Sequence, residues 1–103
     1  MAVVKITKDN FESLKSGSKP LLIDFYADWC MPCQMMAPIV DELSGERDDC
    51  IVGKVNVDEE QELAVMFGVE SIPMFVVIKD GKAVAQNVGM CGKDKLAEMV
   101  DKV

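Results

Sequence analysis

Two cysteines separated by two residues, Cys30 and Cys33, are the side chains of this sequence best suited to catalysis. Thiols at this spacing can close a disulfide and reopen it, so the pair forms a reversible redox couple. A thiolate attacks a disulfide, whereas a protonated thiol does not. The spacing therefore predicts thiol-disulfide exchange, with one sulfur as the nucleophile and the other as the resolving thiol.

The pair stands between a predicted strand and a predicted helix. Residues 21–27 form an almost unbroken apolar run, as in a strand buried on both faces of a sheet, and Asp24 interrupts it. After Cys33, apolar residues recur at steps of three and four through Leu43, which predicts a helix. Pro32 suits the first position of that helix, because its missing N–H would have no partner there.

Cys30 is then expected at the N-terminus of the helix, and Cys33 within its first turn. The free backbone N–H groups and the positive dipole end at such a terminus stabilise an anion by roughly 0.3 to 2 kcal/mol. We therefore expect Cys30 to be the nucleophilic thiolate and Cys33 to be the resolving thiol.

Length, composition and charge restrict the class of protein. The chain has 103 residues, of which 50% are hydrophobic, so residues 1–103 are expected to form a single domain. A formal net charge of -7 disfavours nucleic acid and anionic membranes as partners. No apolar stretch approaches the roughly 18 residues that span a membrane, and the N-terminus does not resemble a secretory signal. We expect a cytoplasmic, monomeric protein.

The remaining pattern predicts an α/β protein with a central mixed β-sheet of about five strands, flanked on both faces by about four helices. Asp9 with Glu12, and Asp58 with Gln61, have the spacing of a capping box that opens a helix. Asp80-Gly81 predicts a tight hairpin turn. Besides the elements around the cysteines, the expected strands are 3–6, 51–57, 74–79 and 82–88, and the expected helices start near 9, 58 and 93.

The chain resembles the thioredoxin family over its whole length, and four short motifs in order along the sequence carry this resemblance. They are Phe25-Tyr26-Ala27-Asp28-Trp29-Cys30-Met31-Pro32-Cys33, Ala37-Pro38, Lys54-Val55-Asn56-Val57-Asp58 and Ser71-Ile72-Pro73. The resemblance implies the thioredoxin fold and a small protein-disulfide reductase without a cofactor. It also implies that Cys30 attacks a disulfide of a target protein, that Cys33 resolves the mixed disulfide, and that a thioredoxin reductase re-reduces the protein.

The same resemblance implies a surface that binds the target protein. In the family a cis-proline lies opposite the two cysteines, and Pro73 occupies that position here. Backbone groups of Ile72 would then face an extended peptide. We expect eight residues to bind substrate, and these are Trp29, Met31, Pro32, Ile72, Pro73, Met74, Gly89 and Met90.

Three of these residues are methionines that depart from the family pattern. Met31 stands where the family usually has glycine, Met74 where it usually has a small polar residue, and Met90 directly after Gly89. Thioether side chains are flexible and polarizable, so they adapt to many partners. We hypothesise that these three methionines form the rim of a broad, apolar-tolerant surface. Four helical methionines are expected in the core instead, namely Met35, Met36, Met66 and Met99.

Asp24 is a carboxylic acid inside a strand that is predicted to be buried. An ionised, unpaired carboxylate there costs on the order of several kcal/mol, so its pKa should be raised. By resemblance, Asp24 lies beneath the two cysteines, where it could take the proton of Cys33. Lys54 on the neighbouring strand is the expected partner of Asp24, and a purely structural pair of the two is the alternative.

Two other interpretations of the cysteine pair stay open. The pair could be half of a zinc site, although zinc needs four ligands, the chain has no histidine, and Cys50 and Cys91 are far apart in sequence. A redox-inert binding module of the same fold would have no need for both cysteines. We expect redox chemistry without a metal, and Cys50 and Cys91 as ordinary small side chains. Cys91, beside Met90, is also a candidate for oxidation or glutathionylation.

Overall fold

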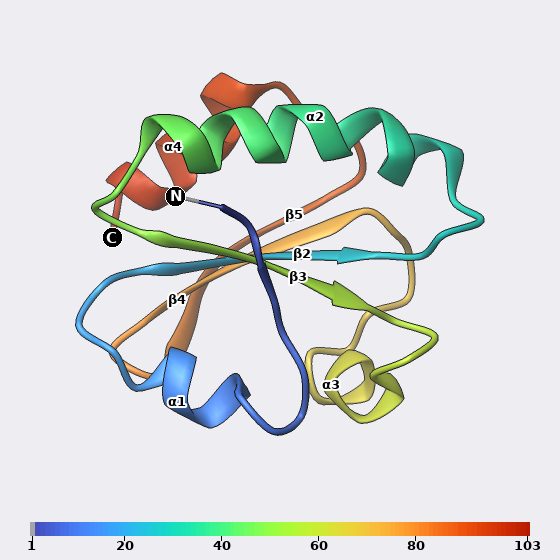
Figure 1. Ribbon diagram of the computed structural model, residues 1–103, viewed down its shortest axis with the longest axis horizontal. Helices are drawn as coiled ribbons and strands as arrows, with labels where there is room; N and C mark the ends of the chain where they lie inside the picture. Colours follow the sequence, from blue (N-terminus) through green and yellow to red (C-terminus); the bar gives the residue numbers. More distant parts are fainter. Residues whose placement is uncertain (1) are drawn as a thin grey trace.

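The computed structural model describes residues 2–103, and within that range the chain forms nine helices and strands (Figure 1). Their order is β1 (Val4–Lys5), α1 (Phe11–Lys15), β2 (Leu21–Tyr26), α2 (Met31–Glu46), β3 (Ile51–Asn56), α3 (Gln61–Met66), β4 (Met74–Lys79), β5 (Lys82–Val88) and α4 (Lys93–Asp101). The predicted α/β fold class is confirmed. None of the helices in residues 2–103 is long and apolar enough to cross a membrane. Met1, where the predicted domain begins, lies outside the described residues.

The sheet has the strand order β1-β3-β2-β4-β5, which places β2 at its centre. β2 runs parallel to β3 and antiparallel to β4, and β5 pairs antiparallel with β4. Figure 1 shows α2 and α4 on one face of the sheet and α1 and α3 on the other. Because β2 is covered on both faces, its residues are buried from Leu21 to Phe25, as its nearly continuous apolar run predicts.

Two large apolar clusters, one on each face of the sheet, fill the interior, and a small third cluster contains Ala27, Cys30 and Cys33. The cluster under α2 and α4 contains Leu22 and Met36, and the cluster over α1 and α3 contains Ile23 and Phe25. Successive side chains of a strand point to opposite faces, so β2 contributes to both clusters. Each fully buried side chain of this size stabilises the fold by about 1.5 to 3 kcal/mol relative to an exposed one.

The β4–β5 hairpin turns at Asp80-Gly81, as the sequence predicts. The φ angles of these residues are 54° and 78°, and two positive values are what a type I′ turn requires. The resulting antiparallel register brings Val88 opposite Met74. The hairpin therefore returns the chain to the end of the sheet where Ile72 and Pro73 lie.

The capping box predicted at the start of α1 is not formed. The helix begins at Phe11 after Asn10, and no side chain caps it. The side-chain oxygen of Asn10 instead accepts a hydrogen bond at 2.8 Å from the backbone N–H of Thr7, which precedes the helix. The asparagine therefore stabilises the loop before the helix, and Asp9 takes no part in a cap.

The capping box predicted for α3 is also wrong. The helix begins at Gln61, three residues after Asp58, and has no side-chain cap. The side-chain oxygen of Asn56 accepts hydrogen bonds from the backbone N–H groups of Asp58 at 2.9 Å and Glu59 at 3.3 Å. An asparagine at the end of β3 thus satisfies the donors of the connecting loop, which delays the start of α3.

Whether a helical methionine is buried depends on the face of the helix on which it lies. Met36 and Met99 are buried, as expected. Met35 and Met66 are exposed, so the prediction that they belong to the core is wrong. The buried stripe of α2 runs at steps of three and four through Met36 and omits Met35, and α3 has only six residues, of which Leu63 alone is buried.

Candidate active site

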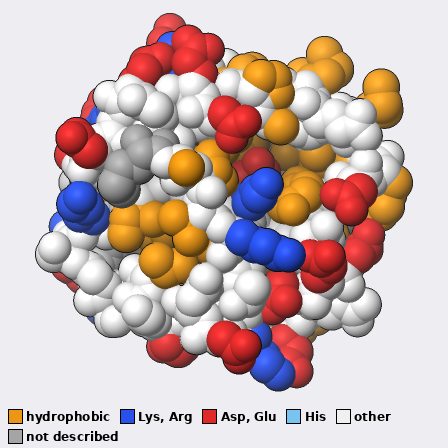
Figure 2. All heavy atoms as spheres, viewed as in Figure 1, with side chains coloured by type: hydrophobic (Ala, Val, Ile, Leu, Met, Phe, Trp, Pro, Cys, Tyr) orange, Lys and Arg blue, Asp and Glu red, His pale blue; other side chains and the backbone are white. Residues whose placement is uncertain are grey.

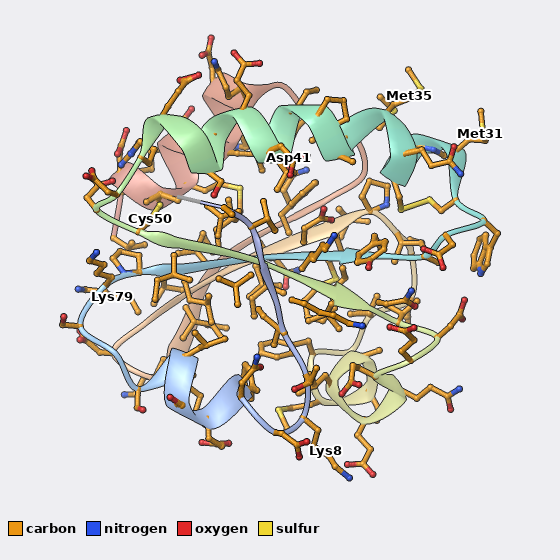
Figure 3. All side chains as sticks on the ribbon, in the orientation of Figure 1. Lys8, Met31, Met35, Asp41, Cys50 and Lys79 are labelled. Atoms are coloured by element: carbon orange, nitrogen blue, oxygen red, sulfur yellow. A yellow bond between two sulfur atoms is a disulfide. The ribbon has the colours of Figure 1, made fainter. Side chains whose placement is uncertain are left out.

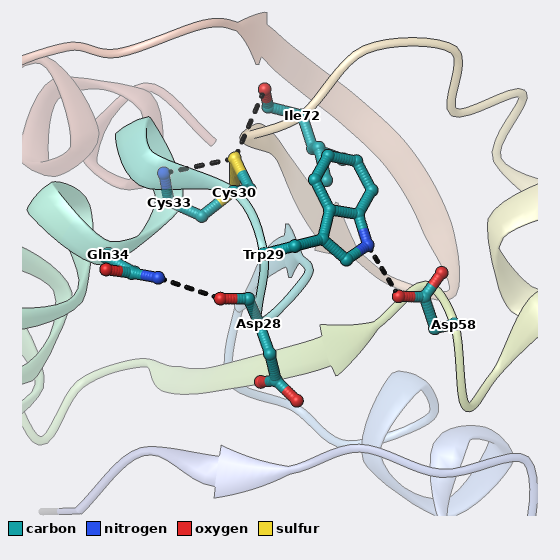
Figure 4. Close-up of a disulfide and its surroundings, with 7 residues drawn as sticks. All are labelled: Asp28, Trp29, Cys30, Cys33, Gln34, Asp58 and Ile72. Atoms are coloured by element: carbon teal, nitrogen blue, oxygen red, sulfur yellow. Dashed lines mark hydrogen bonds between the residues drawn. A yellow bond between two sulfur atoms is a disulfide. The ribbon is translucent and has the colours of Figure 1, made fainter.

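The Cys30–Cys33 pair lies at the start of α2, a few residues beyond the end of β2 (Figure 4). Cys30 is the N-cap residue of α2 and Cys33 lies in its first turn, as predicted. The two side chains form a disulfide, and their Cα atoms are 5.2 Å apart. Only 5% of Cys30 and 4% of Cys33 is exposed. The fold thus holds both sulfurs within bonding distance, as thiol-disulfide exchange requires.

The first turn of α2 gives the Cys30 sulfur a polar environment. The backbone N–H of Cys33 donates a hydrogen bond to Sγ of Cys30 at 3.3 Å. Pro32 stands at the beginning of the helix, where its missing N–H costs no bond. Once the disulfide is reduced, the Cys33 N–H and the helix dipole favour a negative charge on Cys30. This arrangement is the one a nucleophilic thiolate needs.

Three segments that are distant in sequence meet at the disulfide. The Ile72–Pro73 peptide bond is cis, in agreement with the expectation from the resemblance. The carbonyl oxygen of Ile72 lies 3.9 Å from Sγ of Cys30 (Figure 4). The N–H of Gly89 in turn donates to the carbonyl oxygen of Pro73 at 2.8 Å. The loop before β4 and the loop after β5 therefore both flank the cysteine pair.

Trp29 is a large exposed side chain directly before the disulfide, with 68% of its surface accessible. Its Nε1–H donates to Oδ2 of Asp58 at 2.8 Å (Figure 4). The side-chain amide of Gln34 donates to the backbone carbonyl of Asp28 at 2.8 Å, which fastens the segment before Trp29 to α2. These bonds fix the indole to the loop after β3 and the preceding segment to α2, and they leave most of the indole surface accessible.

Asp58 is a residue of this site that sequence reasoning missed, because it was expected only to open α3. The position of Asp58 shortly after the end of β3 could have indicated its role. Tyr26 and Asn56 are paired at the ends of the parallel strands β2 and β3, so residues shortly after each strand must meet at the same edge of the sheet. Trp29 and Asp58 both follow these ends.

Asp24 is buried in the middle of β2, with 5% of its surface exposed. Burial raises the pKa of its carboxyl from 3.8 to about 7, against the positive charge of Lys54, which lowers it, while the negative charge of Asp41 adds to the rise. Within residues 2–103, Oδ1 of Asp24 has no hydrogen-bond partner. The carboxyl therefore gains and loses its proton near neutral pH, which suits a general base.

Lys54 lies beside Asp24, as predicted, but the two do not form a direct ion pair. The parallel register of β2 and β3 places the Cα atoms of both residues opposite each other. The Lys54 ammonium instead lies 5.7 Å from the centre of the Tyr26 ring. Lys54 therefore acts on Asp24 through space across the strand pair.

Two of the three expected rim methionines are exposed. Met31 is 65% exposed and Met90 is 49% exposed. Met35, one turn after Met31, joins them, and Figure 3 shows both side chains projecting outward from the start of α2. Figure 2 shows hydrophobic side chains protruding at this end of the helix. An apolar surface thus borders the disulfide on the α2 side.

Met74 departs from the predicted rim. Only 4% of it is exposed, and it belongs to the core cluster over α1 and α3. As the first residue of β4 it pairs with Phe25 on one side and with Val88 on the other, which holds it within the sheet. The prediction that Met74 stands on the surface rim is therefore wrong.

The other two cysteines are free thiols, with Cys50 buried and Cys91 half-buried. Burial raises the pKa of both thiols, so they are protonated at neutral pH. Within residues 2–103, no group of three or more histidine, cysteine, aspartate or glutamate side chains is arranged to hold a metal ion.

Comparisons with known proteins agree with this geometry. Residues 2–102 match the Thioredoxin family. Thioredoxin from Staphylococcus haemolyticus is 47% identical over 99% of this chain and 98% of its own length, and thioredoxin from Bacillus subtilis is 45% identical over the same shares. A solved mutant thioredoxin from Halobacterium salinarum has a TM-score of 0.91 at 36% identity, covering 98% of this chain and 89% of its own.

A further similar structure concerns the thiol resolving mechanism in yeast mitochondrial 1-Cys peroxiredoxin via glutathione/thioredoxin systems. Its matching chain has a TM-score of 0.88 at 31% identity and covers 98% of this chain and 95% of its own. The family match, the shared fold and the disulfide at the start of α2 point to the same chemistry. The chain is a disulfide oxidoreductase and belongs to the thioredoxin family.

Proposed function

We propose that this protein reduces disulfides of other proteins through a mixed-disulfide intermediate. The Cys30 thiolate attacks one sulfur of the target disulfide, forms a bond to it, and releases the other target sulfur as a thiolate. The Cys33 thiolate then attacks Cys30, releases the second target thiolate, and leaves the Cys30–Cys33 disulfide. The observation that carries this proposal is the position of that disulfide at the N-terminus of α2.

Asp24 is proposed to assist the second step. Cys33 must lose its proton before it can attack the mixed disulfide. A carboxyl whose pKa is about 7 is ionised in an appreciable fraction of molecules at neutral pH, so it can accept that proton. Lys54, by keeping the pKa of Asp24 from rising further, preserves this fraction.

The target is proposed to bind around the disulfide. The backbone of Ile72 would pair with an extended target segment, and the cis-proline Pro73 keeps that backbone beside Cys30. Trp29, Pro32 and Gly89 border the same place. Met31 and Met90 offer thioether surface that adapts to apolar target side chains.

The cycle requires a source of electrons. We propose that a thioredoxin reductase re-reduces the Cys30–Cys33 disulfide, and that the protein itself carries no cofactor or metal. Residues 1–103 would act as one domain and as a monomer in the cytoplasm, on disulfide-containing proteins rather than on nucleic acid or membranes. The likeness to the chain in the yeast peroxiredoxin structure supports protein disulfides as substrates.

Reduction of insulin disulfides by dithiothreitol, with and without the protein, tests this function. The natural protein should accelerate the reaction, and neither Cys30→Ser nor Cys33→Ser should do so catalytically. Cys33→Ser should instead accumulate a mixed disulfide with insulin, visible by mass spectrometry. Turnover by Cys30→Ser, or loss of activity on chelation of a bound metal, would contradict the proposal and favour a different use of the cysteine pair.

A further inference from the structure

A hollow of about 350 Å³ lies beside the Ile72–Pro73 segment, between the end of α3 and the β4–β5 hairpin. It is lined by Phe67, Gly68, Glu70, Ser71, Met74, Gln86 and Val88. The proposed function uses none of its polar side chains. Its position next to the cis-proline raises the question of what it could bind.

The hollow exists because α3 ends early. The helix stops at Met66, and Gly68 follows with a φ of 63°, a left-handed conformation that glycine adopts without strain. The N–H of Val69 donates to the carbonyl oxygen of Ala64 at 2.9 Å, which closes the helix end. The chain then turns toward β4, and the face of β5 around Val88 stays uncovered, so Val88 is exposed.

The lining of the hollow combines polar and apolar side chains. Glu70 supplies the one carboxylate, and neither a lysine nor an arginine lines the hollow. Among residues 2–103, the side chains of Glu70, Ser71 and Gln86 make no hydrogen bond or ion pair with the rest of the protein. Phe67 and Val88 add apolar surface. An unpaired anion beside apolar walls fits a cation carried on an aliphatic chain.

Arginine fits this lining better than lysine. Its planar guanidinium carries five N–H donors, whereas the lysine ammonium is a compact, strongly hydrated charge. Glu70, Ser71 and Gln86 all line the same hollow and all offer oxygen acceptors, which suits a group with several donors better than a single ammonium. The arginine methylene groups would then lie along the apolar wall.

The hollow adjoins the path of a target segment at two points. Ser71 directly precedes Ile72, whose carbonyl oxygen is 3.9 Å from Sγ of Cys30. Val88 directly precedes Gly89, whose N–H is bonded to Pro73. An extended target that crosses Ile72 advances by about 3.3 Å per residue, so a side chain some two or three residues from its cysteine reaches Glu70.

We propose that this hollow is a specificity subsite that selects protein disulfides with an arginine close to the attacked cysteine. The inference rests on the proposed reductase function and adds a substrate class to it. Glu70 attracts the guanidinium, and the preference acts on the attack by Cys30. Acidic and neutral target segments react without this advantage.

Synthetic peptides with a single cysteine, joined through a disulfide to thionitrobenzoate, test the subsite. One series carries arginine in turn at each position near the cysteine, and a matched series carries citrulline, which keeps the shape and removes the charge. Attack by Cys30 on the peptide sulfur breaks the disulfide and releases coloured thionitrobenzoate, and Cys33 then releases the peptide thiol. At low salt, arginine at one or two positions should speed this release about two- to fivefold, the effect of a solvent-accessible charge pair.

Variants assign this preference to Glu70. Glu70→Gln should abolish it and Glu70→Lys should reverse it, while Glu12→Gln, an exposed carboxylate on α1, should leave it unchanged. Equal rates of all four proteins on citrulline peptides show that each is folded. An absent arginine preference, or one that persists in Glu70→Gln, overturns the subsite. Failure of the natural protein to reduce even citrulline peptides overturns the reductase function itself.

Discussion

Cys30 and Cys50 are buried to nearly the same extent, and both contact apolar side chains, yet only Cys30 has backbone polar groups beside its sulfur. Cys30 is 5% exposed and Cys50 is 1% exposed. Cys50 packs among apolar side chains of the α2/α4 cluster, and burial raises the pKa of its thiol. Cys30 caps a helix, accepts a bond from the N–H of Cys33, and lies beside the carbonyl of Ile72.

The difference teaches that backbone dipoles, more than exposure, decide which thiol can react. A sulfur surrounded by methyl groups stays protonated, because nothing near it compensates a negative charge. A sulfur at the start of a helix meets N–H groups that have no other partner. The same distinction applies to Asp24, whose buried carboxyl has no hydrogen bond to Oδ1 within residues 2–103 and a raised pKa.

The largest expected effects come from serine at the two cysteines. Cys30→Ser should slow disulfide reduction by more than about 1000-fold, because a hydroxyl is a far weaker nucleophile at neutral pH. Cys50→Ser should leave this rate unchanged and lower the free energy of unfolding by about 1 to 3 kcal/mol, since it buries a hydroxyl in an apolar site. Insulin reduction and urea unfolding measure the two effects. Similar loss of activity in both variants would remove the distinction between the cysteines.

Asp24→Asn should change the pH dependence of stability. The folded-state pKa of about 7 lies above the unfolded value near 3.8, so ionisation of Asp24 disfavours the native state. This penalty is absent below about pH 4, grows as the pH rises to about 7, and reaches up to about 4 kcal/mol above that. Urea unfolding from pH 4 to 9 should show Asp24→Asn losing less stability than the natural protein.

Asp41→Asn is the matched control for that measurement, because Asp41 is exposed and acts on Asp24 only through its charge. It should retain most of the decline in stability between pH 4 and 7. A decline of the same size in Asp24→Asn and in the natural protein would show that Asp24 is not the group responsible.

Asp24→Asn should also slow resolution of the mixed disulfide by about 100-fold at neutral pH, the lower end of general-base contributions. Attack by Cys30 should change less. Lys54→Met should move the pH at which resolution becomes fast upward, because loss of the cation raises the pKa of Asp24. Rapid-quench measurement of mixed-disulfide decay checks both variants, and an unchanged decay rate in Asp24→Asn would remove Asp24 from the mechanism.

The smallest expected effect concerns the exposed methionines. Replacing Met31 and Met90 together by serine should weaken binding of apolar disulfide peptides by about three- to tenfold, since each thioether that is covered on binding contributes around 1 kcal/mol or less. Val84→Ser, a change at a comparably exposed apolar residue of β5 near the Asp80-Gly81 turn, is the matched control. In a Cys30→Ser background the disulfide peptide binds without reacting, so its affinity can be read by fluorescence of Trp29. Equal affinity with and without the two methionine substitutions would refute the rim.

Sequence patterns correctly predicted those parts of the site whose structure is determined by local residue chemistry. The two cysteines, Pro32 and the Asp80-Gly81 turn all lie where their residue types require. The cis bond before Pro73 came from the resemblance, since nothing in the local sequence specifies it.

The failures arose where tertiary contacts decide the outcome. The side chains of Asn10 and Asn56 accept hydrogen bonds from the backbone of the loops before α1 and α3, where acidic residues were expected to cap the helices. Met74 matched a surface position by motif but is held inside the sheet by its strand neighbours. Asp58 and Glu70 could be connected with the site only after the ends of β3 and α3 were located. Local periodicity predicts neither which strands pair nor that a helix ends early.

Alkylation of the fully reduced protein tests the central distinction most directly. A short exposure to iodoacetamide at neutral pH, followed by mass spectrometry of the peptides, compares all four cysteines in one sample, and the urea-unfolded protein supplies the reference rates. Cys30 should be modified first, well before Cys33 and Cys50. Modification of Cys33 or Cys50 ahead of Cys30 would contradict the account that the start of α2 activates the nucleophile.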